Sequence, residues 1–141
     1  MQPTGKLYTS NPSGLRKLKM DADILLITRA GAEISGAELL RDLAPSSELF
    51  HTYLDQWKHR SGPEWWPRYE ERFLIELKSN VKLNALRDVY KRLLQGRNVV
   101  LVCFCPDHRY CHRRLVGEFF AQYGVHAEEL NPVTVEQVTF F

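Results

Sequence analysis

The chain has 141 residues, of which 44% are hydrophobic and 26% charged, a composition typical of a folded globular protein rather than a disordered one. Its 19 basic and 17 acidic side chains give a formal net charge of +2, which argues against a protein dedicated to coating DNA. The longest apolar run, 99–105, is far shorter than a membrane span, and residues 1–6 lack the apolar core of a signal peptide. We therefore expect one domain over 1–141 that does not enter a membrane.

The cysteines are the first specific feature of the sequence. There are three, an odd number, and all of them lie between Cys103 and Cys111. A secreted disulfide scaffold spreads an even number along the chain, whereas clustered thiols are typical of reactive or metal-binding sites in a reducing compartment. The pattern predicts a cytoplasmic location.

The first half of the chain predicts two strands and a short helix. An extended segment over 6–10 ends at a cluster of turn formers, and a continuous apolar run over 24–28 has the length of a buried strand. Ser35 and Glu38 have the spacing of a capping box, which predicts a short helix that Pro45 ends.

Three longer helices are predicted in the middle of the chain. The first begins near Ser46, the second begins at a further capping box formed by Ser61 and Glu64, and the third ends at Gly96. Apolar residues recur at helical spacing along each of them, so each helix should bury one face.

The last part of the chain predicts a buried strand over 98–105, a helix over about 111–123 and a loosely alternating tail, 133–141, that adds a final edge strand. Buried strands that alternate with helices indicate an α/β fold. We expect a small, mainly parallel sheet flanked by helices, with a helical middle segment.

The strand, loop and helix over 99–118 is where the sequence places the chemistry. Ligands of open α/β sheets bind beyond the carboxyl ends of the strands, where the next helix presents free N–H groups and a positive dipole end to an anion. Helical spacing extends the buried face to Cys111 and His112, which would lie under this cleft. Arg113 lies one turn before Gly117, where the missing side chain would leave room for a functional guanidinium. Arg114 should be a surface charge paired with the residue four positions on.

This segment also carries a resemblance to a known family. Cys103-x7-Cys111-His112-Arg113, entered from an apolar strand, resembles the signature of domain-of-unknown-function family 488. Other stretches agree with the family along nearly the whole chain: Tyr8-Thr9-Ser10 with Leu15, Lys17 and Leu18; Leu43-Ala44-Pro45-Ser46; Tyr69, Glu70, Glu71 and Leu77; and Leu115-Val116-x-Glu118. The resemblance implies an α/β domain and no established reaction. Two positions depart from the family pattern, because Cys105 stands where members often have Glu and Arg109 stands at a variable position.

Three functional hypotheses follow. The first is a small enzyme that acts on an anionic, nucleotide-like or phosphorylated substrate, with Cys103 as nucleophile, His112 as base or orienting partner, Cys111 beside them and Arg113 as the anion clamp. Other anion-binding candidates are those that end the strands or match a cysteine-phosphatase loop: Tyr8, Ser10, Arg29 and Arg109. Pro106 and Asp107 in that loop are unfavourable for phosphatase chemistry.

The second hypothesis is a metal-binding or redox-sensing domain. Five thiol or imidazole groups in one short segment would suit zinc or iron: Cys103, Cys105, His108, Cys111 and His112. The third is a nucleic-acid-binding module, with a basic rim at 16–19 and 108–114 and with Trp65, Trp66 and Tyr69 available to stack on bases. Helical spacing more simply places Trp66 and Tyr69 in the core.

Overall fold

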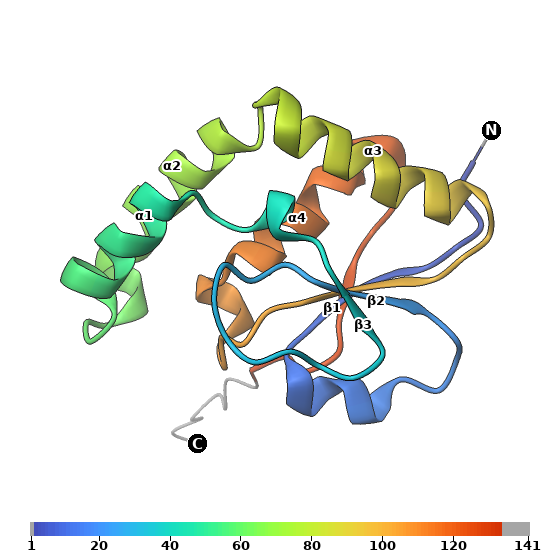
Figure 1. The fold of residues 1–141 in the computed structure, drawn as a ribbon, viewed down its shortest axis with the longest axis horizontal. Helices are drawn as coiled ribbons and strands as arrows, with labels where there is room; N and C mark the ends of the chain where they lie inside the picture. The colour runs from blue at the N-terminus through green and yellow to red at the C-terminus, as the bar shows by residue number, and fades with distance from the viewer. Residues whose placement is uncertain (1, 134–141) are drawn as a thin grey trace, which may run out of the picture.

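The computed structural model describes residues 2–133, which form a twisted parallel sheet with helical segments on both of its faces (Figure 1). The strand order is β3-β2-β4-β1-β5, and each neighbouring pair of strands is parallel. The strands are β1 Leu7–Ser10, β2 Asp23–Leu26, β3 Ala37–Leu39, β4 Val99–Val102 and β5 Glu128–Glu129. The predicted α/β fold with a parallel sheet is confirmed.

The helical middle segment is also confirmed. The α-helices are α1 Ser47–Thr52, α2 Gly62–Glu76, α3 Asn80–Leu94 and α4 His112–Phe119. A π-helical turn, η3 Tyr53–Trp57, continues α1, and four short 3-10 helices are η1 Pro12–Lys17, η2 Arg41–Leu43, η4 His108–Tyr110 and η5 Phe120–Tyr123. Within residues 2–133, no helix has the length and apolar character needed to cross a membrane.

The central strand β4 separates two cores because successive side chains of a strand point to opposite faces. Val99 and Leu101 face the larger core, which α2, α3 and α4 cover. Val100 and Val102 face a smaller core, which residues around η1 cover from the other side of the sheet. All four side chains are buried, which explains why β4 reads as a continuous apolar run.

The helix predicted between Ser35 and Pro45 is wrong. The segment instead forms β3, which pairs with β2, followed by η2. Gly36 has a φ of +82°, a left-handed conformation that interrupts a right-handed helix. The backbone N–H of Leu40 donates to Leu26 O at 2.9 Å, so pairing at the sheet edge outweighs the local preference for a helix.

Two further expectations differ from the structure. Ser61 precedes α2 as expected, but its side chain makes no capping hydrogen bond, and the backbone carbonyl of Ser61 accepts from Glu64 N instead. The edge strand next to β1 is β5, which the sequence does not predict. The edge strand expected over 133–141 falls almost entirely on 134–141, outside the described residues.

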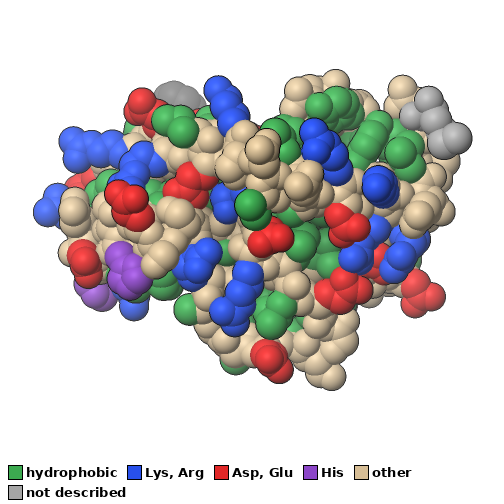
Figure 2. Space-filling model, turned by 45° about the horizontal axis from the view of Figure 1, so that its top comes forward, with side chains coloured by type: hydrophobic (Ala, Val, Ile, Leu, Met, Phe, Trp, Pro, Cys, Tyr) green, Lys and Arg blue, Asp and Glu red, His purple; other side chains and the backbone are tan. Residues whose placement is uncertain are grey.

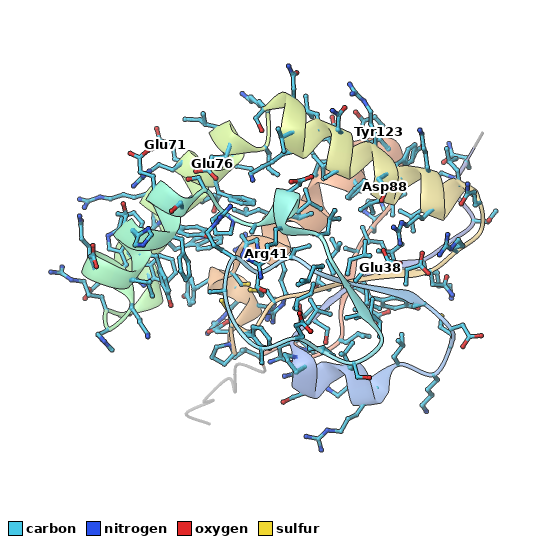
Figure 3. The ribbon with its side chains drawn as sticks, viewed as in Figure 1. Glu38, Arg41, Glu71, Glu76, Asp88 and Tyr123 are labelled. Carbon is cyan, nitrogen blue, oxygen red and sulfur yellow. The ribbon has the colours of Figure 1, made fainter. Side chains whose placement is uncertain are left out.

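Polar side chains fasten the helices to the sheet. Arg92 of α3 forms ion pairs with Asp23, Glu38 and Asp88 at 3.0, 2.9 and 3.2 Å, and Glu38 and Asp88 lie along the same side of the molecule in Figure 3. The Ser46 side chain accepts from Leu49 N at the start of α1, as its position in the sequence predicts.

Candidate active site

Cys103 is the first residue after β4, and its side chain is buried at the carboxyl end of the sheet. Its backbone N–H donates to Ser10 O at 3.1 Å, which extends the pairing of β4 with β1 by one residue. Alternation along the strand turns the Cys103 side chain to the same face as Leu101, the face that α2, α3 and α4 cover. The thiol therefore lies between the end of the sheet and the first turn of α4.

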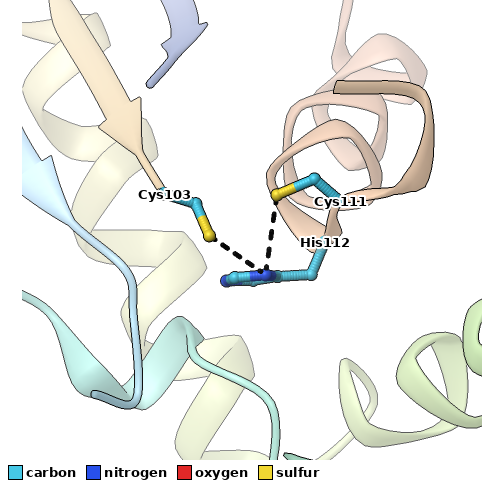
Figure 4. A group of neighbouring side chains, drawn as sticks. All are labelled: Cys103, Cys111 and His112. Carbon is cyan, nitrogen blue, oxygen red and sulfur yellow. Dashed lines mark hydrogen bonds between the residues drawn. The ribbon is translucent and has the colours of Figure 1, made fainter. Parts of the chain in front are cut away.

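His112 begins α4, and its buried ring is fixed by a hydrogen bond to the backbone. Nε2 lies 2.7 Å from the carbonyl oxygen of Ile27, just after β2. Because a carbonyl oxygen can only accept, Nε2 carries the ring proton and Nδ1 of the neutral ring keeps its lone pair. That nitrogen lies 3.8 Å from Cys103 Sγ and 4.0 Å from Cys111 Sγ, so both thiols are placed to donate to it (Figure 4).

A third thiol, that of Cys105, lies 3.8 Å from Cys103 Sγ. Hydrogen bonding from Cys105 lowers the pKa of Cys103, but the Cys111 thiol and burial raise it by more, so the net pKa is far above that of a free cysteine. Hydrogen bonding with Cys103 raises the pKa of Cys105 to about 12, against a lowering effect of Cys111. Both thiols are protonated at neutral pH in the free protein.

Arg113 is fully buried, and its guanidinium is committed to groups of the protein. Nε and Nη2 donate to the Glu129 carboxylate at 2.9 and 3.2 Å. Nη1 donates to Cys105 O at 2.7 Å and lies 3.5 Å from Cys111 Sγ. Burial lowers the pKa of Arg113, but the hydrogen bond to the Glu129 carboxylate and the charge of that carboxylate outweigh it, so the pKa is raised and Arg113 stays a cation. It joins α4, β5 and the loop after β4.

The sequence predicts that the space beside Gly117 takes the Arg113 guanidinium, and the structure shows a different use for it. A Cβ at Gly117 would lie 3.0 Å from Ala127 Cβ and 3.1 Å from Thr9 Cγ2, so the glycine allows α4 to approach the sheet and is not a seat for Arg113. Arg114 does form the expected surface pair, with Nε 2.8 Å from Glu118 Oε1.

The thiols and His112 form part of the wall of a cavity of about 140 Å³. The rest of the lining is mostly aromatic and comes from the loop after β2, the turn before α1, α1, η3, α2, and the segment after β4 that includes η4: Thr28, Arg29, Ala30, Pro45, Phe50, Tyr53, Trp65, Tyr69, Phe104, Cys105 and Tyr110. Cys103, Cys111 and His112 complete it. The site is thus a small ring-lined cavity at the carboxyl ends of parallel strands.

Of the strand-end residues singled out in the sequence, Arg29 lines the cavity and Tyr8 and Ser10 do not. Arg29 Nε donates to Pro45 O at 2.6 Å. The Tyr8 ring belongs to the smaller core on the opposite face of the sheet, where its hydroxyl contacts Met20 Sδ at 3.5 Å. The Ser10 hydroxyl donates to Asn11 O at 2.7 Å. The two-residue period of β1 sends both side chains away from Cys103.

The remaining candidates of the loop after β4 also lie apart from the cavity. The Arg109 guanidinium donates to both carboxylate oxygens of Asp107, at 3.0 and 2.8 Å, and is half-exposed. His108 Nδ1 accepts from Val133 N at 3.3 Å. The structure therefore brings together Cys103, Cys105, Cys111 and His112, and leaves His108 and Arg109 outside.

Sequence reasoning did not identify Tyr53 and Tyr110 as cavity residues, and it offered Trp65 and Tyr69 as base-stacking candidates for a nucleic acid. Trp66 and Tyr69 are buried, as their helical spacing predicts, although Tyr69 also lines the cavity. On the face that Figure 2 shows, basic and acidic side chains are interspersed and form no basic patch. Charge partners such as Glu129 could be found only from the fold, because no spacing rule links them to residue 113.

The donor set could also hold a metal ion. One ligand atom each from Cys103, Cys111 and His112 lies within 4.8 Å of the others, and all three side chains are buried. Two thiolates and an imidazole are ligands that suit zinc or iron, and the hydrogen bond from His112 Nε2 to a backbone carbonyl is the usual orientation of a ligating histidine.

A comparison with protein-family models matches residues 7–124 to DUF488-N3a, described as the active DUF488-N3 subclade. Neither the curated proteins nor the solved structures contain a significant match. The family resemblance carried by the cysteine, histidine and arginine motif is thereby confirmed over most of the chain.

Proposed function

Because the chain belongs to the DUF488-N3a family, the active DUF488-N3 subclade, we propose that it is a small enzyme that acts on an anionic, nucleotide-like substrate. The observation that carries the proposal is the 3.8 Å contact between Cys103 Sγ and His112 Nδ1 on the wall of an aromatic cavity. Nucleophilic catalysis requires a nucleophile within reach of a base that a third group orients. Here the third group is the carbonyl of Ile27.

In the proposed reaction, His112 Nδ1 takes the proton of the Cys103 thiol while the sulfur attacks an electrophilic atom of the substrate. A bond forms from sulfur to that atom, the bond to the leaving group breaks, and the leaving group takes the proton from His112. Water then attacks the same atom and gives a proton to His112, which returns it to the departing sulfur. The net reaction is hydrolysis, and the protein ends unchanged.

The raised pKa of Cys103 fits a thiol that loses its proton during attack rather than before it. A stable thiolate needs no base, whereas a protonated thiol is unreactive without one. A thiol of high pKa is also the stronger nucleophile once His112 has removed its proton. The dyad therefore depends on His112 more than a low-pKa cysteine would.

Arg29 and Arg113 take different roles in the proposal. Arg29 lines the cavity and supplies the positive charge for an anionic substrate. Arg113 acts as a positioning residue, because its contacts to Glu129 and Cys105 O hold the start of α4 and the loop after β4 in place. The three cysteines are free thiols, and such a site requires a reducing compartment such as the cytoplasm.

The test is turnover of a panel of nucleoside mono-, di- and triphosphates, followed by chromatography of the products and intact-mass analysis of acid-quenched protein. We expect turnover of at least one member, loss of that turnover in Cys103→Ser and in His112→Gln, and near-normal turnover in the exposed control Glu118→Gln. Failure of the whole panel, or turnover that persists in Cys103→Ser, would contradict the proposal.

A metal centre is the second candidate, and the 4.8 Å cluster of Cys103, Cys111 and His112 favours it. Three protein ligands beside a cavity resemble a catalytic zinc site, in which the fourth position is open to water or substrate. Elemental analysis of the untagged protein distinguishes the two candidates. About one equivalent of zinc or iron that is lost in Cys111→Ser would favour the metal centre, because one site binds one ion. Metal-free protein that still turns over its substrate would exclude it.

A further inference from the structure

The walls of the cavity are largely aromatic and can stack on a planar ring. Side chains of six aromatic residues face it: Phe50, Tyr53, Trp65, Tyr69, Phe104 and Tyr110. They hold one another in edge-to-face contacts, with ring centroids 5.2 Å apart for Tyr53 and Trp65 and 5.7 Å apart for Trp65 and Tyr69. Such walls stack on any planar ring that enters between them.

The size of the cavity, about 140 Å³, sets the size of that ring. An apolar protein cavity of about 150 Å³ holds one benzene molecule, so this volume matches one six-membered ring. Phe104, one of the wall residues, packs its ring against Gly31. A Cβ at Gly31, whose φ is +123°, would come within 2.6 Å of the Phe104 ring.

Two phenol groups of the lining have no hydrogen-bond partner among residues 2–133. Tyr69 is only 6% exposed, yet its hydroxyl donates to no group of the described protein, and the hydroxyl of the half-buried Tyr53 is in the same situation. Burial raises the pKa of both, so both remain donors at neutral pH. By contrast, Trp65 Nε1 already donates to Arg60 O at 3.3 Å. Among the described residues, the buried side-chain donor without a partner is Trp66 Nε1, so the Tyr69 and Tyr53 hydroxyls are both accessible to solvent. Both are therefore free to donate to acceptor atoms of a ligand in the cavity that these residues line.

Arg29 adds a positive charge to the lining. The bond from Nε to Pro45 O fixes the side chain, and its two terminal nitrogens have no partner within the part of the chain that the structure describes. Since the rest of the lining is mostly aromatic, an anionic group of the ligand would bind at Arg29. The ring would then enter between the aromatic walls, toward the thiols.

We propose that the cavity binds a pyrimidine mononucleotide, with the ring between the aromatic walls, a ring carbonyl at the Tyr69 and Tyr53 hydroxyls and the phosphate at Arg29. This inference rests on the proposed function, because it names the substrate class of the same site. On this proposal, the volume of the cavity selects a pyrimidine over a purine, and the aromatic walls select a nucleotide over a sugar phosphate. Arg29 selects a nucleotide over a nucleoside.

Isothermal titration calorimetry on the full chain tests it, with uridine, cytidine, adenosine and guanosine monophosphates, uridine and ribose 5-phosphate as probes. We expect a pyrimidine mononucleotide to bind at least about tenfold more tightly than either purine mononucleotide, because a second ring overfills the cavity. Uridine should bind about tenfold more weakly than its monophosphate, and ribose 5-phosphate should not bind measurably, because each lacks one of the two anchors. Equal binding of purines and pyrimidines, binding of ribose 5-phosphate alone, or no binding of any nucleotide would overturn the inference.

Two variants and one control locate the bound nucleotide. Tyr69→Phe should weaken the binding of the pyrimidine mononucleotide about tenfold because one hydrogen bond is lost, while the control Tyr90→Phe, on α3 and away from the cavity, should not change it. Arg29→Met should bind uridine and its monophosphate alike. An unchanged affinity in both Tyr69→Phe and Arg29→Met would place the ligand elsewhere and contradict the inference.

The binding experiment and the turnover experiment fail separately. Tight binding of pyrimidine mononucleotides without any turnover would leave this inference standing and remove the proposed reaction. Turnover of purine and pyrimidine nucleotides alike through Cys103 would leave the proposed reaction standing and overturn the inference of a pyrimidine-selective cavity.

Discussion

Arg113 and Glu129 form a buried ion pair, with Nε 2.9 Å from Oε1, that joins the first turn of α4 to the edge strand β5. Neither residue lines the cavity, yet Arg113 also holds Cys105 O and approaches Cys111 Sγ. Arg113 therefore stabilises the site through contacts outside the cavity. This relationship leads to two predictions about stability.

Removal of the Glu129 charge should destabilise the fold. Glu129→Gln leaves a buried guanidinium without its counter-ion, so we expect the free energy of unfolding in urea to fall by about 3 kcal/mol. The matched control is Glu118→Gln, which removes the exposed pair with Arg114 and should cost less than about 1 kcal/mol. An equal loss of unfolding free energy in the two variants would show that the buried Arg113–Glu129 pair stabilises the fold no more than the exposed Arg114–Glu118 pair.

The same pair should make stability depend on acid pH. Burial raises the pKa of Glu129, but hydrogen bonds from Arg113 and Thr9 outweigh it, so the folded-state pKa is lower than the ordinary glutamate value. A lowered pKa contributes stability above the unfolded value, about 4.3, and this contribution is lost as the pH falls through the folded value. Urea unfolding from pH 7 to pH 3 should show the gap between wild type and Glu129→Gln narrowing below about pH 4. A gap that stays constant down to pH 3 would be inconsistent with the lowered pKa.

Gly62 should be intolerant of a side chain because it supports a cavity residue. A Cβ at this position would lie 2.4 Å from Tyr110 Cδ2, so Gly62→Ala must move the ring of Tyr110 or the start of α2. We expect a loss of about 1–3 kcal/mol in stability, typical of overpacking, as well as weaker ligand binding. Ser61→Ala is the control, since the Ser61 side chain is exposed and makes no capping bond. A Gly62→Ala protein as stable as Ser61→Ala would contradict this packing.

Lys82 should stabilise the turn that follows η2. Its Nζ donates to Asp42 O at 2.9 Å and to Ala44 O at 2.6 Å, and burial lowers its pKa. Lys82→Met leaves two carbonyl groups without this donor, so we expect stability to fall by about 1–3 kcal/mol in thermal or urea unfolding. The exposed Lys78→Met serves as control and should be nearly neutral. If Lys82→Met is as stable as Lys78→Met, the two hydrogen bonds of Lys82 do not stabilise the fold.

The sequence predicts those parts of the structure that depend on local pattern. The apolar run of β4 and the helical stripes of α2 and α3 each reflect a periodicity that one stretch of chain contains. The helix expected at Ser35 fails because the pairing of β3 with β2 is a long-range contact that no local signal reports. The edge strand β5 is short and polar, and it forms only because β1 lies beside it.

The candidate site follows the same division. Cys103, Cys111 and His112 lie close in sequence, so a strand followed by a helix is enough to bring them together. Four of the six aromatic wall residues come from α1, η3 and α2, and their position over Cys103 depends on how those helices pack on the sheet. Arg113 resembles an anion clamp in the sequence because its partner, Glu129, is 16 residues away in another element. Tyr8 and Ser10 end a strand next to β4 but face the wrong side of it.

The most direct test of the Cys103–His112 pair is the rate at which iodoacetamide alkylates Cys103, followed by peptide mass spectrometry at neutral pH in the presence of EDTA. If His112 Nδ1 accepts the thiol proton, His112→Gln should slow the alkylation of Cys103 by about 100-fold, the usual contribution of a general base, while Glu118→Gln leaves it unchanged. Circular dichroism of each variant confirms that it is folded. A Cys103 that reacts as fast in folded His112→Gln as in wild type would show that the two residues do not act as a catalytic pair.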